Sequence, residues 1–186
     1  MRHLVINFFA FEAGWSACVL GAANGMPWLG LLVPAVIIAL HLKLTAKPAA
    51  ELKLVVVAIV MGLFFDSLLV SAGWIVYPNG TFIPGMAPYW IIAMWAMFAT
   101  TLNVSMGWLK KRLLLAAVMG AVFGPISYAA GAKLGGLEFI NYQASMIALS
   151  VIWAVSMPIL FMAARRYNGI AARRRRPAFI TVGEEI

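Results

Sequence analysis

The sequence predicts an all-α fold, a polytopic membrane protein built as a six-transmembrane-helix bundle with N and C termini cytoplasmic. Hydrophobic residues make up 64% of the 186-residue chain and charged residues only 11%, a balance far from that of soluble domains. Six apolar stretches are long enough, or nearly so, to cross a hydrocarbon core of about 30 Å. Basic residues gather on one side of these stretches, which indicates their direction.

The six expected spans follow one another through most of the chain. They cover residues 4–22, 27–42, 54–77, 89–109, 113–132 and 142–164. They form one membrane domain, residues 1–165, followed by a basic cytoplasmic tail, residues 166–186. The first stretch contains Glu12 and therefore differs from the apolar core of a signal peptide. We expect it to be retained as a helix.

The distribution of lysine and arginine gives the orientation. Of these 14 residues, all but Lys133 lie before the first span, between spans two and three, between spans four and five, or in the tail. This bias is typical of cytoplasmic loops, and it requires an even number of spans. Because topology explains the net charge of +8, we expect no nucleic-acid partner.

Aromatic and small residues add detail to this arrangement. Interfacial positions are expected for eight aromatic residues, namely Trp28, Trp74, Tyr77, Tyr89, Trp90, Tyr142, Trp108 and Tyr167. Trp15, Trp95 and Trp153 fall inside spans, where they either pack against helices or form the wall of a ligand site. Gly120 and Gly124 begin a stripe of small residues that favours close helix packing. The uncharged loop at 78–88 is expected to lie back over the outer face.

Two carboxylates lie deep in the predicted spans. Glu12 is near the middle of the first span and Asp66 near the middle of the third. A charged Asp at the centre of a membrane helix costs roughly 2.5–3.5 kcal/mol, so neither acid is expected to face lipid. Three arrangements satisfy them: a protonated, hydrogen-bonded acid, a cation held between them, or a water-filled cavity.

These acids and their neighbours make up the candidate site. Asp66 is the candidate catalytic acid or base. The ligand-binding candidates are Asp66, Glu12, Trp15, Asn7, Trp95, Asn103 and Tyr128. The chain has two histidines, one cysteine and no zinc-hydrolase or nucleotide-binding motif. We therefore expect neither a metal nor a cofactor.

A family resemblance rests on four groups of residues. They are Asn7 and Trp15 in the first span, "GLFFDSLLVSAGW" at 62–74, "APYWIIAMWAMFATTLN" at 87–103, and "GAVFGPISYAAGAKLGG" at 120–136. Over residues 4–165 the chain resembles the bacterial inner-membrane family called domain of unknown function 2878. The resemblance implies a multi-pass protein of the bacterial inner (plasma) membrane. Genes of that family often neighbour those of cyclopropane-synthase-type methyltransferases and flavin amine-oxidase-like proteins, which implies a lipid-related role.

The sequence leaves three functions open. The first is binding or moving an acyl lipid or a small hydrophobic molecule, with membrane lipids and a lipid-modifying enzyme as partners. The second is an acid–base enzyme acting on a lipid through Asp66. The third is a substrate-capturing subunit of a multi-subunit transporter, which would have a transporter partner.

Overall fold

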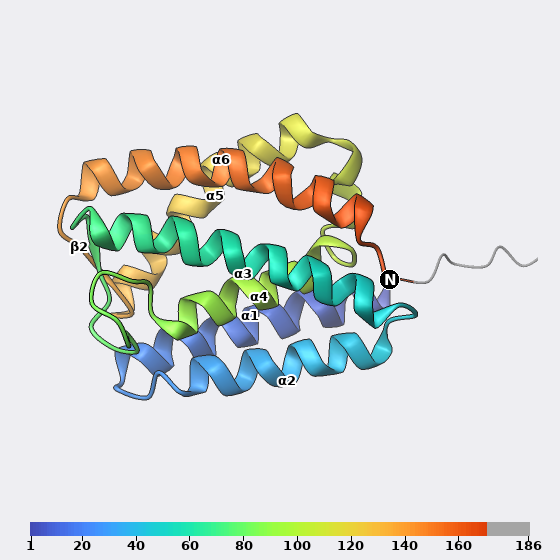
Figure 1. Ribbon diagram of the computed structural model, residues 1–186, viewed down its shortest axis with the longest axis horizontal. Helices are drawn as coiled ribbons and strands as arrows, with labels where there is room; N and C mark the ends of the chain where they lie inside the picture. Colours follow the sequence, from blue (N-terminus) through green and yellow to red (C-terminus); the bar gives the residue numbers. More distant parts are fainter. Residues whose placement is uncertain (171–186) are drawn as a thin grey trace, which may run out of the picture.

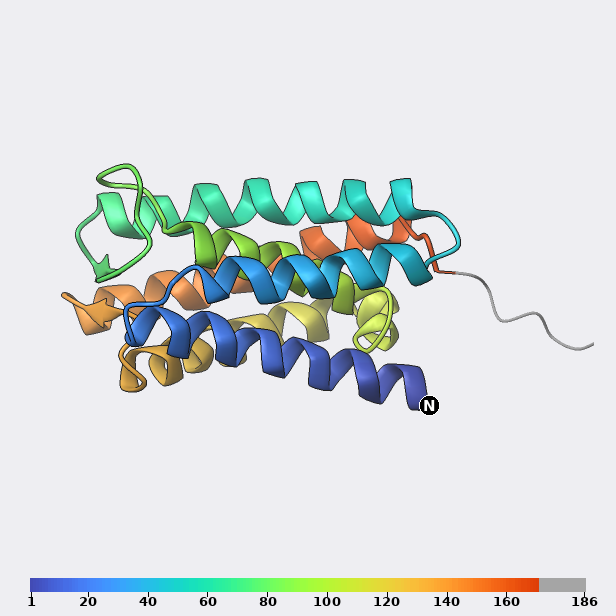
Figure 2. The same ribbon diagram turned by 90° about the horizontal axis from the view of Figure 1, so that it is seen from below.

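The computed structural model describes residues 1–170 and contains six α-helices, one 3-10 helix and one two-stranded sheet within them. The helices are α1 (Arg2–Ala23), α2 (Leu29–Leu44), α3 (Pro48–Ser71), α4 (Tyr89–Leu102), α5 (Leu113–Lys133) and α6 (Tyr142–Arg166). The remaining elements are β1 (Ile75–Val76), η1 (Gly107–Lys111) and β2 (Glu138–Phe139). The helices run roughly side by side along the long axis, and the N-terminus lies at the same end as the end of α6 (Figures 1 and 2).

Four of these helices are long and apolar enough to cross a membrane. They are α1, α3, α5 and α6. The other two are apolar but shorter, with 16 residues in α2 and 14 in α4. At 1.5 Å per residue these extend only about 24 and 21 Å, less than the hydrocarbon thickness of about 30 Å. The described chain is thus an all-helical, multi-pass membrane protein with four clear candidate spans.

Helix α4 occupies the middle of the bundle, where it packs against α1, α2, α3 and α6. It ends at Leu102, whereas the sequence predicted a span reaching residue 109. Thr100 and Thr101 direct their hydroxyls to the carbonyls of Met97 and Phe98, three residues earlier. Such local bonds accompany helix ends, and the backbone then turns into η1. The apolar composition of residues 103–109 had concealed this break.

Helix α3 begins earlier than predicted, at Pro48 instead of residue 54, and ends at Ser71 instead of 77. Proline favours the first turn of a helix because it has no N–H to lose there. This shift corrects the predicted depth of two acids. Glu51, expected in a loop, lies in the first turn of α3, and Asp66 lies near the end of the helix instead of at its middle.

The end of the bundle opposite the N-terminus is closed by the two-stranded sheet and by the loop at 78–88. Strands β1 and β2 pair antiparallel, with Ile75 opposite Phe139. In the loop, Asn79 donates from Nδ2 to the carbonyl of Ala22 at 2.9 Å. Ser67 Oγ accepts the N–H of Ala87 at 3.0 Å. The prediction that this loop lies back over the helix ends is confirmed.

Glycines allow tryptophans to lie directly on neighbouring helices. A Cβ at Gly124 would come within 2.3 Å of Cγ of Trp153, and one at Gly62 would come equally close to Cγ of Trp95. The Trp95 and Trp153 rings stack, with centroids 4.5 Å apart and planes inclined by 12°. The two rings therefore join α3 to α5 through one continuous stack, and the expected tight packing along the glycine stripe is confirmed at Gly124.

Not every expected interfacial aromatic lies at the surface. Trp28, Trp108 and Tyr142 are exposed, in keeping with the prediction. Trp90 and Tyr77 are buried among the helices and the loop at 78–88. Trp90 donates from Nε1 to the carbonyl of Asn79 at 2.9 Å, and Tyr77 turns inward from the outer loop. Of the predicted tail at 166–186, residues 171–186 lie outside the described residues.

Candidate functional site

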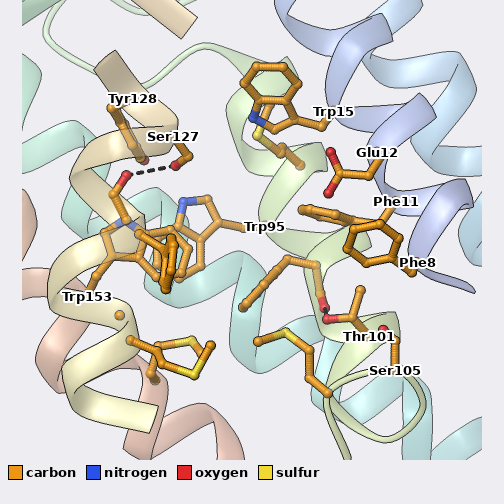
Figure 3. Close-up of a pocket in the computed structure, with 18 of the residues that line it drawn as sticks. Phe8, Phe11, Glu12, Trp15, Trp95, Thr101, Ser105, Ser127, Tyr128 and Trp153 are labelled. Carbon is orange, nitrogen blue, oxygen red and sulfur yellow. Dashed lines mark hydrogen bonds between the residues drawn. The ribbon is translucent and has the colours of Figure 1, made fainter. Parts of the chain in front are cut away.

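A cavity of about 550 Å³ lies between α1, α4, α5 and α6. Its lining is dominated by aromatic and methionine side chains, with a few polar groups among them (Figure 3). The lining residues are Phe8, Phe11, Glu12, Trp15, Ile91, Met94, Trp95, Phe98, Thr101, Ser105, Met106, Trp108, Met119, Gly120, Phe123, Gly124, Ser127, Tyr128, Trp153 and Met157. A concave, apolar site with few polar groups is typical of small-molecule binding.

The back wall of the cavity is a rigid aromatic surface. It contains the Trp95–Trp153 stack, and Phe98 meets Trp153 edge-on at 5.5 Å between centroids. Phe98 also meets Phe11 of α1 at 5.7 Å. Because the glycines of α3 and α5 hold the two indoles in place, this wall has little freedom to collapse into the space beside it.

The cavity opens sideways between α1 and α5. Residues of α1 and α5 face each other across it in Figure 3, and several of them are exposed although they line it. Phe8 is 50% exposed on α1, Phe123 is 59% exposed on α5, and Trp108 of η1 is 54% exposed. The opening therefore lies on the apolar flank of the bundle, the surface that a membrane protein presents to acyl chains.

Asp66 is sealed inside the bundle behind this cavity, with 1% of its surface exposed. Oδ1 accepts hydrogen bonds from the hydroxyls of Tyr77, at 2.8 Å, and Tyr128, at 2.7 Å. Oδ2 accepts a hydrogen bond from Nε1 of Trp95 at 2.7 Å. Each of the three partners has a hydrogen to donate, so both oxygens of Asp66 are engaged. Its partners are Tyr77, which directly follows β1, Trp95 of α4 and Tyr128 of α5, and Asp66 thereby ties these elements to α3.

The contacts of Asp66 show how this acid is satisfied inside the bundle. Hydrogen-bond donors surround it, and neither a cation nor the second acid does so among residues 1–170. The carboxyl does not line the cavity, whereas Trp95 and Tyr128 do. Asp66 is thus placed to position two wall residues. Tyr77 was missed as a partner because nothing in its sequence position shows that a loop tyrosine turns back into the bundle.

Glu12 has a different environment. It lies halfway along α1, is exposed, and points into the cavity between Trp15 and Phe11 (Figure 3). Asp66 is thus enclosed by helices, whereas Glu12 lines the cavity. Glu12 and Trp15 were both predicted as ligand-binding residues, and both line the cavity with Trp95 and Tyr128.

Asn7 does not line the cavity, but it holds a residue that does. Its Oδ1 accepts hydrogen bonds from the backbone N–H and the hydroxyl of Ser105, at 3.2 and 2.7 Å. Its Nδ2 donates to the carbonyl of Thr100 at 3.3 Å. Asn7 therefore fastens α1 to the break after α4, and Ser105, the residue it holds, lines the cavity.

Comparison with protein families shows which family the chain matches. The family model described as "Protein of unknown function (DUF2878)" matches residues 4–159. The chain belongs to this family. The predicted resemblance is therefore confirmed. Comparison of this DUF2878 member with curated proteins and with solved structures finds no match.

A second polar cluster of the DUF2878 chain lies at the opposite end, around Glu51, which is 1% exposed. Oε1 accepts hydrogen bonds from Nδ2 of Asn103 at 2.8 Å and from the backbone N–H of Gly169 at 2.6 Å. Oε2 lies 3.0 Å from Nε2 of His41. Sequence reasoning missed this cluster because Glu51 stands among lysines, although Pro48 was an available signal for a helix start.

Asn103 belongs to this cluster and not to the cavity, so the two candidate groups predicted as one site are separate. Its Oδ1 accepts a hydrogen bond from Nζ of Lys110 at 2.6 Å. Burial lowers the pKa of Lys110, and the nearby charge of Glu51 partly offsets this effect. The cluster joins α2, α3, η1 and the segment after α6. It therefore holds these elements together at this end of the bundle.

Residues 1–170 contain no group of three or more His, Cys, Asp or Glu side chains that could hold a metal ion. His41 has Glu51 as its one acidic partner there. The polar groups that the cavity lining offers to a ligand are those of Glu12 and of the hydroxyl-bearing Thr101, Ser105, Ser127 and Tyr128.

Proposed function

We propose that this protein binds a hydrophobic or acyl-chain molecule in the cavity between α1 and α5, and that the molecule enters from the membrane. The observation that carries the proposal is the open apolar cavity of about 550 Å³. Its volume falls within the roughly 300–1,000 Å³ of small-molecule sites. The rigid tryptophan wall keeps the space available, and the exposed Phe8 and Phe123 place its mouth on the apolar flank.

The energetics of a membrane site bear on what is bound. An acyl chain that moves from lipid into this cavity exchanges one apolar environment for another. The hydrophobic effect therefore contributes little to the free energy of binding. Selection then depends on shape and on the few polar groups at the wall. This favours a molecule with one hydrophobic part and one small polar part over a plain hydrocarbon.

The proposal includes a topology and a location. We propose six passes, with α2 and α4 as short spans, both termini in the cytoplasm and a bacterial inner-membrane location. The lysine and arginine distribution and the family resemblance support this arrangement. We propose an accessory role for this protein. It would deliver the bound molecule to a lipid-modifying enzyme, or to a transporter that uses this chain as its capturing subunit.

Binding is tested by purifying the protein in mild detergent and identifying co-purified molecules by mass spectrometry. Ser127→Leu should fill the cavity, because Ser127 lines it from α5, and should lower the retained molecule several-fold. Ile126→Phe is the matched control, since Ile126 is 52% exposed on the same helix and does not line the cavity. Retention that is absent from the wild type, or equal in all three proteins, would overturn the proposal.

Direct acid–base catalysis by Asp66 has less support from the geometry. Both of its oxygens are engaged, and the side chain is separated from the cavity by its own donors. A general acid or base needs hydrogen-bond reach of its substrate. The contacts of Asp66 favour a positioning role toward Tyr128 and Trp95.

A further inference from the structure

Glu12 is the one acidic side chain on the cavity wall, and it has no partner within the described residues. It makes no hydrogen bond and no ion pair with any part of residues 1–170. The cavity lining contains no lysine, arginine or histidine. A carboxylate at the midpoint of a membrane helix is costly without a counter-charge. The cavity beside Glu12 gives a cationic group of a ligand access to this carboxylate.

Aromatic rings flank this carboxylate on its own helix. Phe8, Phe11 and Trp15 stand three or four residues from Glu12 or from one another, a spacing that places all of them on one face of α1. Figure 3 shows the Glu12 carboxylate between Trp15 and Phe11, directed into the cavity. Aromatic faces attract ammonium groups through their quadrupoles, and tryptophan does so most strongly.

We infer that the bound molecule carries a protonated amine that pairs with Glu12 and lies against Trp15 and Phe11, while its hydrophobic part fills the space beside Trp153. The inference rests on the proposed function and names its ligand class, an amphipathic amine. An anionic headgroup, such as a fatty-acid carboxylate, would meet a like charge and no basic side chain. A plain alcohol would pair less strongly, because its hydrogen bond lacks the second charge.

The test compares three molecules that share one bromine-labelled long alkyl chain and end in an amine, an alcohol or a carboxylate. Bromine on the chain quenches the fluorescence of tryptophans beside the cavity, so quenching titrations in detergent give an affinity for each. The wild type should bind the amine roughly ten-fold or more tightly than the alcohol, the effect of a charge-assisted contact, and the carboxylate most weakly.

Glu12→Gln is the decisive variant, and Glu138→Gln is its control because Glu138 is an exposed acid of β2 outside the cavity. The amine preference should disappear in Glu12→Gln and persist in Glu138→Gln. Equal binding of amine and alcohol by the wild type, or an unchanged preference in Glu12→Gln, overturns the ammonium inference while hydrophobic binding stands. Binding of none of the three molecules overturns both.

Discussion

The Asp66 network makes the sharpest prediction about stability. In Asp66→Ala, the hydroxyls of Tyr77 and Tyr128 and the indole N–H of Trp95 would all lose their acceptor in the buried interior. A buried donor without a partner costs about 1–3 kcal/mol. The two tyrosine hydroxyls share one oxygen of Asp66, so they are close enough to interact in its absence, and the low end of the range applies.

Three donors at the low end give a loss of about 3 kcal/mol in the free energy of unfolding. For a chain of this size, 1 kcal/mol corresponds to roughly 2–4 °C in Tm, so Asp66→Ala should lower Tm by about 6–12 °C. Tyr77→Phe removes a single hydrogen bond and should cost less. Asp66→Asn keeps one oxygen for the tyrosines but turns an amide toward Trp95, so its Tm should fall between those of the wild type and Asp66→Ala.

The measurement is thermal unfolding of the purified proteins in one detergent, followed by tryptophan fluorescence. The order of Tm values carries the result more securely than any single value, because the shared acceptor makes the three contributions non-additive. An Asp66→Ala protein as stable as the wild type, or more stable than Tyr77→Phe, would refute the conclusion that the carboxylate holds the three elements together.

Two further predictions concern packing and the Glu51 cluster. Gly124→Ala should cost about 1–3 kcal/mol by overpacking, because its Cβ would meet Trp153, whereas Gly107→Ala, whose nearest neighbour would be 3.7 Å away, should have little effect on Tm. Equal Tm values for the two variants would contradict the close approach of α5 to α6. Glu51→Ala should release Gly169, since it removes the oxygen that accepts the Gly169 N–H, and hydrogen–deuterium exchange just after α6 should rise; unchanged exchange there would rule out this anchoring role.

Composition and periodicity predicted the fold class well, because membrane helices need long apolar runs whatever packs beside them. Element ends were predicted less well where a local signal opposed composition. Pro48 started α3 within a lysine-rich stretch, and the hydroxyls of Thr100 and Thr101 accompanied the end of α4 inside an apolar run. In both places the signal is carried by one or two residues, which an average over a window does not detect.

The site could be predicted in part from the cost of burying charge. That cost singled out both Asp66 and Glu12, and the structure then separates them, with Asp66 in the interior and Glu12 at the cavity. The cost of burying charge gave no means of finding Tyr77, because the approach of this residue to Asp66 depends on how the chain folds back at the loop 78–88. Nor did it show that Asn103 faces Glu51, since the two residues are 52 positions apart in the chain.

The sideways mouth between α1 and α5 has a consequence for any quantitative study of occupancy. A molecule that reaches the site from among acyl chains equilibrates with its mole fraction in the bilayer and not with its concentration in water. Apparent affinity should therefore change with the ratio of lipid or detergent to protein, as dilution within the two-dimensional phase empties the site. Titrations at several such ratios would separate true competition from simple dilution.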